Sequence, residues 1–366
     1  MKRILVIVIS SLLLLGCAMT NRLSNENIEI DFLDEHILPA DLIYENTKVG
    51  GLSGIDYYNG SYYLVSDQAS NPRIYIANID IKNKKFESIE LEKLITIEKT
   101  GQFFEAYLDL EAVRYDSDSK EIVIASEGMI DQSKDPGIYR LNEQGELKNK
   151  FKLPSYFSST GNKKPRNNGV FEGLTESFDK KAYWTATELP LEHEGPKPKI
   201  YPTKSHIRIT KFDKKTGDPV HQFVYKLDGI SKLPINYFAV NGVTEILEYK
   251  QDRFLILERA YSAGYGSHGN TVKIFEVDAS KATNTLNFEN LKNENYLKAE
   301  KKLIFNFKSV RDKLTDGIID NIEGMTFGPE LENGKRSLIL VSDNNFNSFS
   351  KQLNQFILLE IDFKNL

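Results

Sequence analysis

The sequence predicts an all-β fold, a β-propeller with five four-stranded blades. Three observations predict it. A short phrase that opens on a polar or acidic residue returns five times, at intervals of roughly 60 to 80 residues. An apolar strand that ends in an acid follows each phrase, and a strand with alternating apolar residues comes next. A repeat of this length that is built from strands is typical of propellers.

Two positions recur in every repeat. The phrases are Ser53-Gly54-Ile55, Glu111-Ala112-Val113, Glu172-Gly173-Leu174, Glu245-Ile246-Leu247 and Glu323-Gly324-Met325. The apolar strands that follow them end at Asp67, Glu127, Glu188, Glu258 and Asp343. If the second strand of each repeat runs antiparallel to the first, both positions lie on the same face of the propeller. The longest predicted loops also lie on that face, which is where function tends to reside.

The first repeat shows the four strands of one blade. Leu52–Tyr57 and Tyr62–Ser66 form the first two strands, and Asn59-Gly60 between them accepts the positive φ angles of a tight hairpin. Arg73–Asp80 alternates as a half-buried third strand should, and Phe86–Ile97 supplies the fourth. The later repeats follow the same plan.

The last repeat ends after its third strand, Gln355–Asp362. The segment from Asn27 to Tyr44 contains two short apolar stretches and precedes the first repeat. We therefore expect it to supply the missing strand, so that both ends of the chain close one blade and no open edge remains. A sixth, degenerate blade is the alternative, and Asp278–Lys301 is the additional material from which it would form.

The N-terminus predicts a lipoprotein signal. An apolar run from Ile4 to Leu15 follows two basic residues, and Gly16 stands before Cys17, the only cysteine. The run is too short to span a membrane as a helix. An ordinary secretory signal with an incidental cysteine is the alternative. The predicted organisation is a lipoprotein signal peptide over residues 1–16, a polar tether over 17–27 that begins with lipidated Cys17, and a single propeller domain over 28–366.

Composition and the residue after Cys17 bear on partners and location. The chain has 47 Lys and Arg against 52 Asp and Glu, a formal net charge of −5. Such a mild negative charge argues against nucleic acid as a partner. We expect a monomer in the cell envelope that contacts a membrane only through its N-terminal lipid. Ala18 follows the cysteine in place of the aspartate associated with inner-membrane retention, which favours the outer membrane.

The repeated acids should converge on the propeller axis. Two ionised carboxylates about 5 Å apart repel by about 3 kcal/mol at an effective dielectric constant near 20. A ring of them therefore needs protons, basic partners or a metal ion. The predicted metal ligands are Asp67, Glu111, Glu127, Glu188, Glu245, Glu258 and Asp343, with Asp109 close by.

Oxygen-only ligands favour a hard cation, Ca²⁺ before Mg²⁺. The five histidines show no spacing that is typical of a metal site, which argues against zinc. The alternative is that these acids are structural and accept hydrogen bonds from backbone N–H groups around the axis.

Several phrases together resemble the bacterial phytase-like family, usually described by the esterase-like activity of phytase. The residues that carry the resemblance are Gly50–Asp56, Asn168–Leu174, Ile256–Arg259, Asn321–Met325 and Val341–Phe346. The resemblance covers roughly residues 45 to 365. It implies a secreted propeller with phosphoesterase or esterase activity, and it is the sole source of phytate as a suggested substrate.

The first hypothesis is a Ca²⁺-dependent hydrolase that acts on an anionic small-molecule phosphoester. Glu172 and Glu323 are the candidate catalytic bases. The candidate phosphate-binding residues are Arg259, Arg166, Lys163 and Lys164. Two alternatives remain open. One is a non-catalytic, calcium-stabilised propeller that binds a ligand or a protein partner. The other is a metal-dependent lactonase or carboxylesterase.

Overall fold

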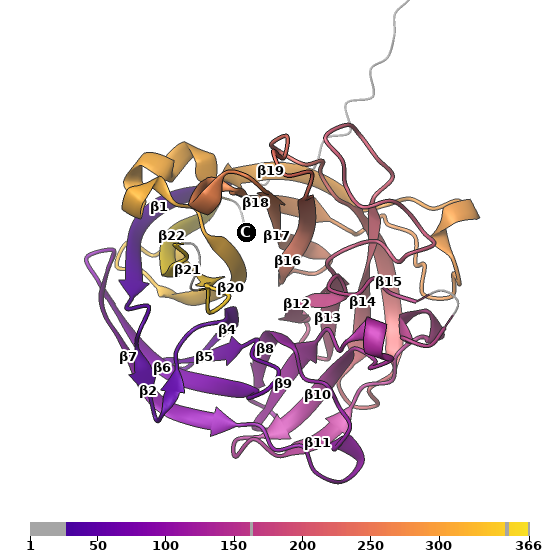
Figure 1. Ribbon diagram of the computed structural model, residues 1–366, viewed down its shortest axis with the longest axis horizontal. Coiled ribbons are helices and arrows are strands. Elements are labelled where there is room, and N and C mark those ends of the chain that lie inside the picture. The colour runs from indigo at the N-terminus through magenta and orange to yellow at the C-terminus, as the bar shows by residue number, and fades with distance from the viewer. Residues whose placement is uncertain (1–26, 162–163, 348–350, 365–366) are drawn as a thin grey trace, which may run out of the picture.

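The computed structural model describes residues 27–161, 164–347 and 351–364. Five antiparallel sheets of four strands each surround a central axis, as Figure 1 shows, and the prediction of a five-bladed propeller is confirmed. The first strand of each blade contacts the first strands of its neighbours at the axis. The remaining strands follow outward in chain order, except that β1 is the outermost strand of blade 5.

The blades divide the strands as follows. Blade 1 contains β4 (Leu52–Tyr58), β5 (Ser61–Ser66), β6 (Arg73–Lys82) and β7 (Lys85–Thr96). Blade 2 contains β8 (Leu110–Asp116), β9 (Glu121–Ser126), β10 (Gly137–Asn142) and β11 (Leu147–Lys150). Blade 3 contains β12 (Phe171–Glu176), β13 (Ala182–Thr187), β14 (His206–Asp213) and β15 (Pro219–Lys226). Blade 4 contains β16 (Ala239–Lys250), β17 (Arg253–Ser262), β18 (Asn270–Asp278) and β19 (Glu300–Asn306). Blade 5 contains β20 (Asn321–Glu330), β21 (Arg336–Asp343), β22 (Asn354–Lys364) and β1 (Asn27–Leu38).

The elements outside the blades are short. β2 (Ile43–Tyr44) and β3 (Thr47–Lys48) form a two-stranded hairpin. The 3₁₀-helices are η1 (Gly101–Phe103), η2 (Ile130–Gln132), η3 (Ser155–Phe157), η4 (Gly266–His268), η5 (Leu291–Asn293), η6 (Phe307–Lys313) and η7 (Thr315–Gly317). Within the described ranges, no helix has the length and apolar character needed to cross a bilayer.

Both ends of the chain close blade 5. β1 pairs antiparallel with β22 from Asn27 opposite Lys364 to Leu38 opposite Asn354. This pairing covers the outer edge of β22 and confirms the predicted closure by an N-terminal strand. Leu38 lies at the end of the blade where β21 finishes, and Asn27 lies at the opposite end.

The additional material after β18 does not form a sixth blade. It runs instead along the outer edge of β15, where Thr285 N–H donates to the Gln222 carbonyl and Ala299 N–H to the Val224 carbonyl, both at 2.9 Å. The segment therefore satisfies backbone groups that the last strand of blade 3 would otherwise leave open.

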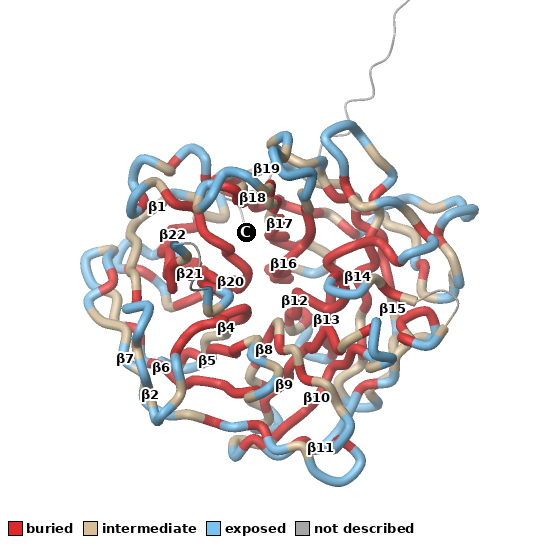
Figure 2. Tube along the Cα trace, in the orientation of Figure 1, coloured by how far each residue is buried: buried red, intermediate tan, exposed pale blue. Residues whose placement is uncertain are grey.

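Buried apolar side chains pack between neighbouring blades. Figure 2 shows that the inner strands are mostly buried. The interface of blades 3 and 4 is built on aromatic rings. The Trp184 ring lies 5.3 Å from that of Phe223 and 5.4 Å from that of Phe254, centroid to centroid, in edge-to-face contacts. The alternation in the sequence places these rings on the inner faces of the sheets.

Each first strand carries a β-bulge at the same height. In β4, Leu52 pairs with Ser66 and Gly54 with Val65, so that Ser53 has no opposite residue. The same shift recurs in the other four first strands. The residues that it displaces toward the axis are Ser53, Glu111, Glu172, Thr244 and Glu323.

Small residues follow several of these bulges because the strands come very close at the axis. A Cβ on Gly54 would lie 2.8 Å from Cα of Ala112 in blade 2, and a Cβ on Gly324 would lie 3.0 Å from Cα of Gly54. Bulk at either position would separate the blades.

One buried ion pair closes the axis. Arg114 Nη2 in β8 lies 2.9 Å from Glu245 Oε2 in β16. Arg114 also donates to the Ile55 carbonyl of β4 at 2.8 Å, and its Nη2 lies 3.5 Å from the Met325 carbonyl of β20. Glu245 Oε1 accepts a hydrogen bond from the Leu174 N–H of β12 at 3.0 Å. This ion pair therefore contacts the first strands of all five blades.

Replacing Arg114 by Met should destabilise the protein by about 3 to 5 kcal/mol, because Glu245 would remain buried without a positive partner. Urea unfolding measures this change. The double variant Arg114→Met/Glu245→Met should recover much of the loss, and the exposed control Lys181→Met should stay within about 0.5 kcal/mol of the parent. A double variant less stable than Arg114→Met would contradict the electrostatic account.

Candidate functional site

A cavity of about 690 Å³ opens on the face where first strands begin and second strands end. Its walls come from all five blades: for example Asp67 in blade 1, Glu127 in blade 2, Glu188 in blade 3, Arg259 in blade 4 and Asp343 in blade 5. The Arg114–Glu245 ion pair closes the axis between the first strands.

The strand register decides which side chains reach the cavity. In each second strand, the residue that follows the pair preceding the bulge returns to the cavity face, as Asp67 does after Ser66, the partner of Leu52. The equivalent residues in the next two blades are Glu127 and Glu188. In blade 4 it is Arg259, which pairs with Gly242, and in blade 5 it is Asp343. Four carboxylates and one guanidinium thus occupy this ring of positions.

Glu245 and Glu258 were predicted at these ring positions, and the structure does not bring them to the cavity. The bulge in β16 lies at Thr244, so Glu245 is one residue out of register with Glu111, Glu172 and Glu323. Glu258 pairs with Val243 and therefore precedes the ring position by one residue. A shift of one residue turns a strand side chain to the other face.

Both displaced acids are already paired with protein groups. Glu258 accepts hydrogen bonds from Asn241 Nδ2 and Lys301 Nζ, each at 2.7 Å. Glu245 belongs to the ion pair at the axis. Their contacts are structural. For these two residues the structure therefore favours the alternative in which the repeated acids bind protein groups instead of a metal ion.

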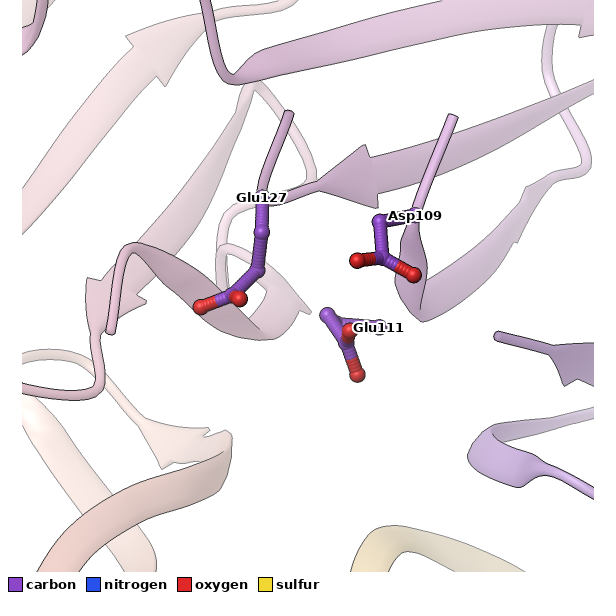
Figure 3. Close-up of side chains that lie close together, drawn as sticks. All are labelled: Asp109, Glu111 and Glu127. Carbon is purple, nitrogen blue, oxygen red and sulfur yellow. The ribbon is translucent and has the colours of Figure 1, made fainter. Parts of the chain in front are cut away.

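The remaining acids of blades 2 and 3 form two overlapping groups. Asp109, Glu111 and Glu127 each offer an oxygen within 4.8 Å of the other two, and so do Glu127, Glu172 and Glu188. Figure 3 shows the first group, in which Asp109 and Glu111 at the start of β8 face Glu127 at the end of β9. Glu127 is common to both. These buried acidic groups could bind a metal ion.

Burial makes this arrangement costly without a cation. Burial and, second, the charge of Glu188 raise the pKa of Glu127 to about 8. A hydrogen bond from the Val170 N–H opposes this shift. Burial and neighbouring carboxylates raise the pKa of Glu111 and of Glu172 well above the usual range. At neutral pH, protons or a cation must therefore neutralise part of the cluster.

The acids of blade 5 are neutralised differently. Arg259 Nη2 lies 3.0 Å from Glu323 Oε1 and 3.9 Å from Glu188 Oε1. Asn321 Nδ2 donates to Glu323 at 2.9 Å and to Asp343 at 3.1 Å. Arg259 thus supplies positive charge to Glu323 and to the Glu188 end of the second carboxylate group. The group of Asp109, Glu111 and Glu127 has no such ion pair among the described residues.

The other predicted basic residues lie elsewhere. Arg166 donates to the Pro190 carbonyl at 3.0 Å and to the Gly195 carbonyl at 2.9 Å, which holds the loop between β13 and β14. Neither Arg166 nor Lys164 is among the residues that line the cavity. Lys163 and Cys17 lie outside the described residues, so the predictions for them stay predictions.

Sequence reasoning missed several residues of the cavity. Lys197 reaches it from the loop between β13 and β14, and Phe238 and Tyr261 line it from blade 4. Asn270, opposite Tyr261 in the sheet, is buried, and its Oδ1 atom has no hydrogen-bond partner among the described residues. These residues do not occupy equivalent positions in the repeats, so the repeat pattern could not identify them. The apolar residues in the loop before β16 are the one sequence feature that could have indicated a binding surface.

The model of the phytase-like family, described as esterase-like activity of phytase, matches residues 47–346. No curated protein matches the chain. Among solved structures, a DUF4221 family member from Bacteroides vulgatus is 13% identical, with a TM-score of 0.39 over 93% of this chain and 99% of that one. Glutaminyl cyclase from Myxococcus xanthus is 8% identical, with a TM-score of 0.40 over 92% and 98%. Exo-β-1,3-galactanase from Phanerochaete chrysosporium is 11% identical, with a TM-score of 0.44 over 88% and 63%.

The raised pKa values predict how stability depends on pH when metal is removed. A carboxyl whose pKa is higher in the folded state binds protons more readily there, so its contribution to stability is present at low pH and is lost as pH rises through the folded value. For Glu127 and Asp67 that value is about 8. We expect the chelated protein to lose at least about 2 kcal/mol of unfolding free energy between about pH 5 and about pH 9.

Urea unfolding of the chelated protein across this range checks the expectation. Glu127→Gln keeps an oxygen that can accept from the Val170 N–H, and it should flatten the dependence. The exposed Glu192→Gln should leave it unchanged. A chelated protein that gains stability toward high pH would contradict the assignment.

Proposed function

The chain belongs to the phytase-like family, whose model spans residues 47–346, and from this premise we propose that it is a Ca²⁺-dependent phosphoester hydrolase. The observation that carries the proposal is the pair of carboxylate groups that share Glu127. Such a cluster needs a cation, and a cation in an open cavity attracts anionic oxygens.

The lining of the cavity fits a hard divalent cation. The residues that would hold it are Asp109, Glu111, Glu127, Glu172 and Glu188. Among the described residues that line the cavity, none is Cys or His. Ca²⁺ accepts six to eight oxygen ligands in flexible geometry, whereas Mg²⁺ demands a near-ideal octahedron, so a crowded set of carboxylates favours Ca²⁺. When bound, the cation supplies Lewis acidity and charge stabilisation to the reacting group.

Arg259 and Lys197 are the residues proposed to bind non-reacting phosphate oxygens. Arg259 is fixed by its contact with Glu323, and its Nε is buried with no hydrogen-bond partner among the described residues. The Arg259 side chain also lines the cavity. Lys197 lines the same cavity. Charge-assisted hydrogen bonds of this kind are stronger than neutral ones.

Glu323 is the proposed proton acceptor. It belongs to neither carboxylate group, and hydrogen bonds from Arg259 and Asn321 hold its Oε1 at 3.0 and 2.9 Å. A carboxylate that is held in place and is not a metal ligand can accept a proton from the attacking water molecule. Glu172, the other candidate base, lies within the second carboxylate group and is proposed as a ligand instead.

We also propose that Cys17 carries a lipid that anchors the protein to the outer membrane. β1 begins at Asn27, on the end of the blade opposite the cavity. A tether that leaves from there would hold the cavity open to the surroundings, away from the bilayer.

Adding Ca²⁺ to the metal-stripped protein should raise its melting temperature by several degrees. A ligand at 100 times its Kd stabilises the folded state by about 2.7 kcal/mol. Glu127→Gln, which affects both carboxylate groups, should abolish most of the rise, and the exposed Glu192→Gln should retain it. Calorimetry with Ca²⁺, Mg²⁺ and chelator measures the effect. No shift with either ion would exclude a metal site.

Glu323→Gln should reduce kcat on p-nitrophenyl phosphate by about 10² to 10⁴-fold, the range expected for a general base. The same variant should keep the Ca²⁺-dependent rise in melting temperature, since Glu323 is not a proposed ligand. Turnover by the parent protein tests the function itself. Calcium binding without turnover of any ester would support the non-catalytic propeller, and turnover of p-nitrophenyl acetate alone would support the carboxylesterase.

A further inference from the structure

One wall of the cavity is apolar and comes from blade 4. Phe238 and Tyr261 line the cavity, with ring centroids 6.2 Å apart. The loop that precedes β16 adds exposed side chains beside them: Leu233 is 66% exposed, Ile235 61%, Tyr237 99% and Phe238 57%. We call Phe238 and Tyr261 the blade-4 wall; Leu233, Ile235 and Tyr237 lie in the adjoining loop, outside the cavity lining. Clustered exposed apolar side chains beside a cavity are typical of binding sites.

The blade-4 wall is held in place. Ile235 N–H donates to the Ala263 carbonyl and Ala263 N–H to the Phe238 carbonyl, both at 2.9 Å. Tyr265 Oη donates to the Leu233 carbonyl at 2.8 Å. Tyr237 has a φ of 59°, a left-handed conformation that is unfavourable for a bulky residue. Strain of this kind persists where surrounding bonds enforce it, and it is concentrated at functional sites.

The charges in the cavity argue against a substrate with many phosphates. Among the described residues, nine with carboxylates line it, against two basic residues, Lys197 and Arg259. Arg259 is already shared between Glu323 and Glu188. A phosphate must therefore lie where a bound cation, Arg259 and Lys197 supply positive charge. Additional phosphates would face carboxylates without cations.

The acidic part and the apolar part of the cavity lining lie on different blades. Both carboxylate groups belong to blades 2 and 3, whereas the apolar wall belongs to blade 4. The cavity volume of about 690 Å³ lies within the range of sites that bury a whole small molecule. A ligand with an anionic end and an apolar end could therefore bind the carboxylate groups through a cation and the blade-4 wall through its apolar end.

We propose that the substrate is a phosphomonoester of an aromatic or other apolar alcohol, and that the blade-4 wall binds the apolar group while its single phosphate lies at the carboxylate groups. This inference rests on the proposed hydrolase function and names its substrate class. Phytate, a polyphosphate suggested by the family resemblance, is then a poor substrate.

The test compares 2-naphthyl phosphate, glycerol 3-phosphate and phytate with the Ca²⁺-loaded full-length protein. The kcat/KM for 2-naphthyl phosphate should exceed the other two at least tenfold, chiefly through KM. Phe238→Ala should remove about tenfold of that preference, chiefly by raising KM for 2-naphthyl phosphate. Because Phe238 is 57% exposed, this change should not affect folding. Leu297→Ala, 67% exposed and outside the cavity lining, is the matched control.

Titration calorimetry with Glu323→Gln separates this inference from the proposed function. In that variant, 2-naphthyl phosphate should bind at least tenfold more tightly than glycerol 3-phosphate, and Phe238→Ala should cancel the difference. If this preference holds but the parent hydrolyses no phosphoester, the proposed function fails while recognition of the apolar group stands. Equal affinities for the two monoesters, or phytate as the tightest ligand, would overturn the inference even if turnover occurs.

Discussion

The buried contact between Arg114 and Glu245 is the constraint on which the arrangement at the axis depends. Five strands that converge on one axis leave a channel, and each brings backbone carbonyls and N–H groups to it. Arg114 and Glu245 satisfy such groups in four strands besides binding each other across the channel. Burial raises the pKa of Glu245 to about 7, and the Arg114 charge is the main opposing influence. A fixed, buried ion pair therefore holds the first strands together at the axis.

Blade 4 departs from the other blades at both repeated positions, and this departure organises the cavity. Thr244 replaces the bulge carboxylate and bonds to the Ile322 carbonyl, while Arg259 replaces the closing carboxylate. Without Arg259, the carboxylates of blade 5 would need a cation of their own. With it, Glu323 and Glu188 gain a positive partner within the protein, and blade 4 also presents aromatic surface to the cavity. A polarised cavity follows from two substitutions in an otherwise repetitive fold.

The sequence predicted the blades, the closing strand and most of the converging acids, because strand alternation and Asn-Gly turns are local signals. Glu245 and Glu258 were misplaced for a specific reason. A bulge changes which residue faces the axis without changing composition, and Thr-Glu in β16 offers an acid one residue away from the true position. Lys197 and Phe238 lie in long loops. The conformation of such loops depends on tertiary packing, which the periodicity of the sequence does not reveal. Arg259 was identified as basic and near the site, but its place in the ring emerged only from the strand register.

The closing strand also determines how the molecule responds to a mechanical load. A pull on the chain before Asn27 acts along β1, whose partner β22 runs antiparallel over the whole length from Lys364 to Asn354. If the opposing force acts at the cavity end of blade 5, where Asn354 lies, the load shears the ladder, and its hydrogen bonds resist together instead of opening one at a time. Blade 5 is then the blade that bears the force.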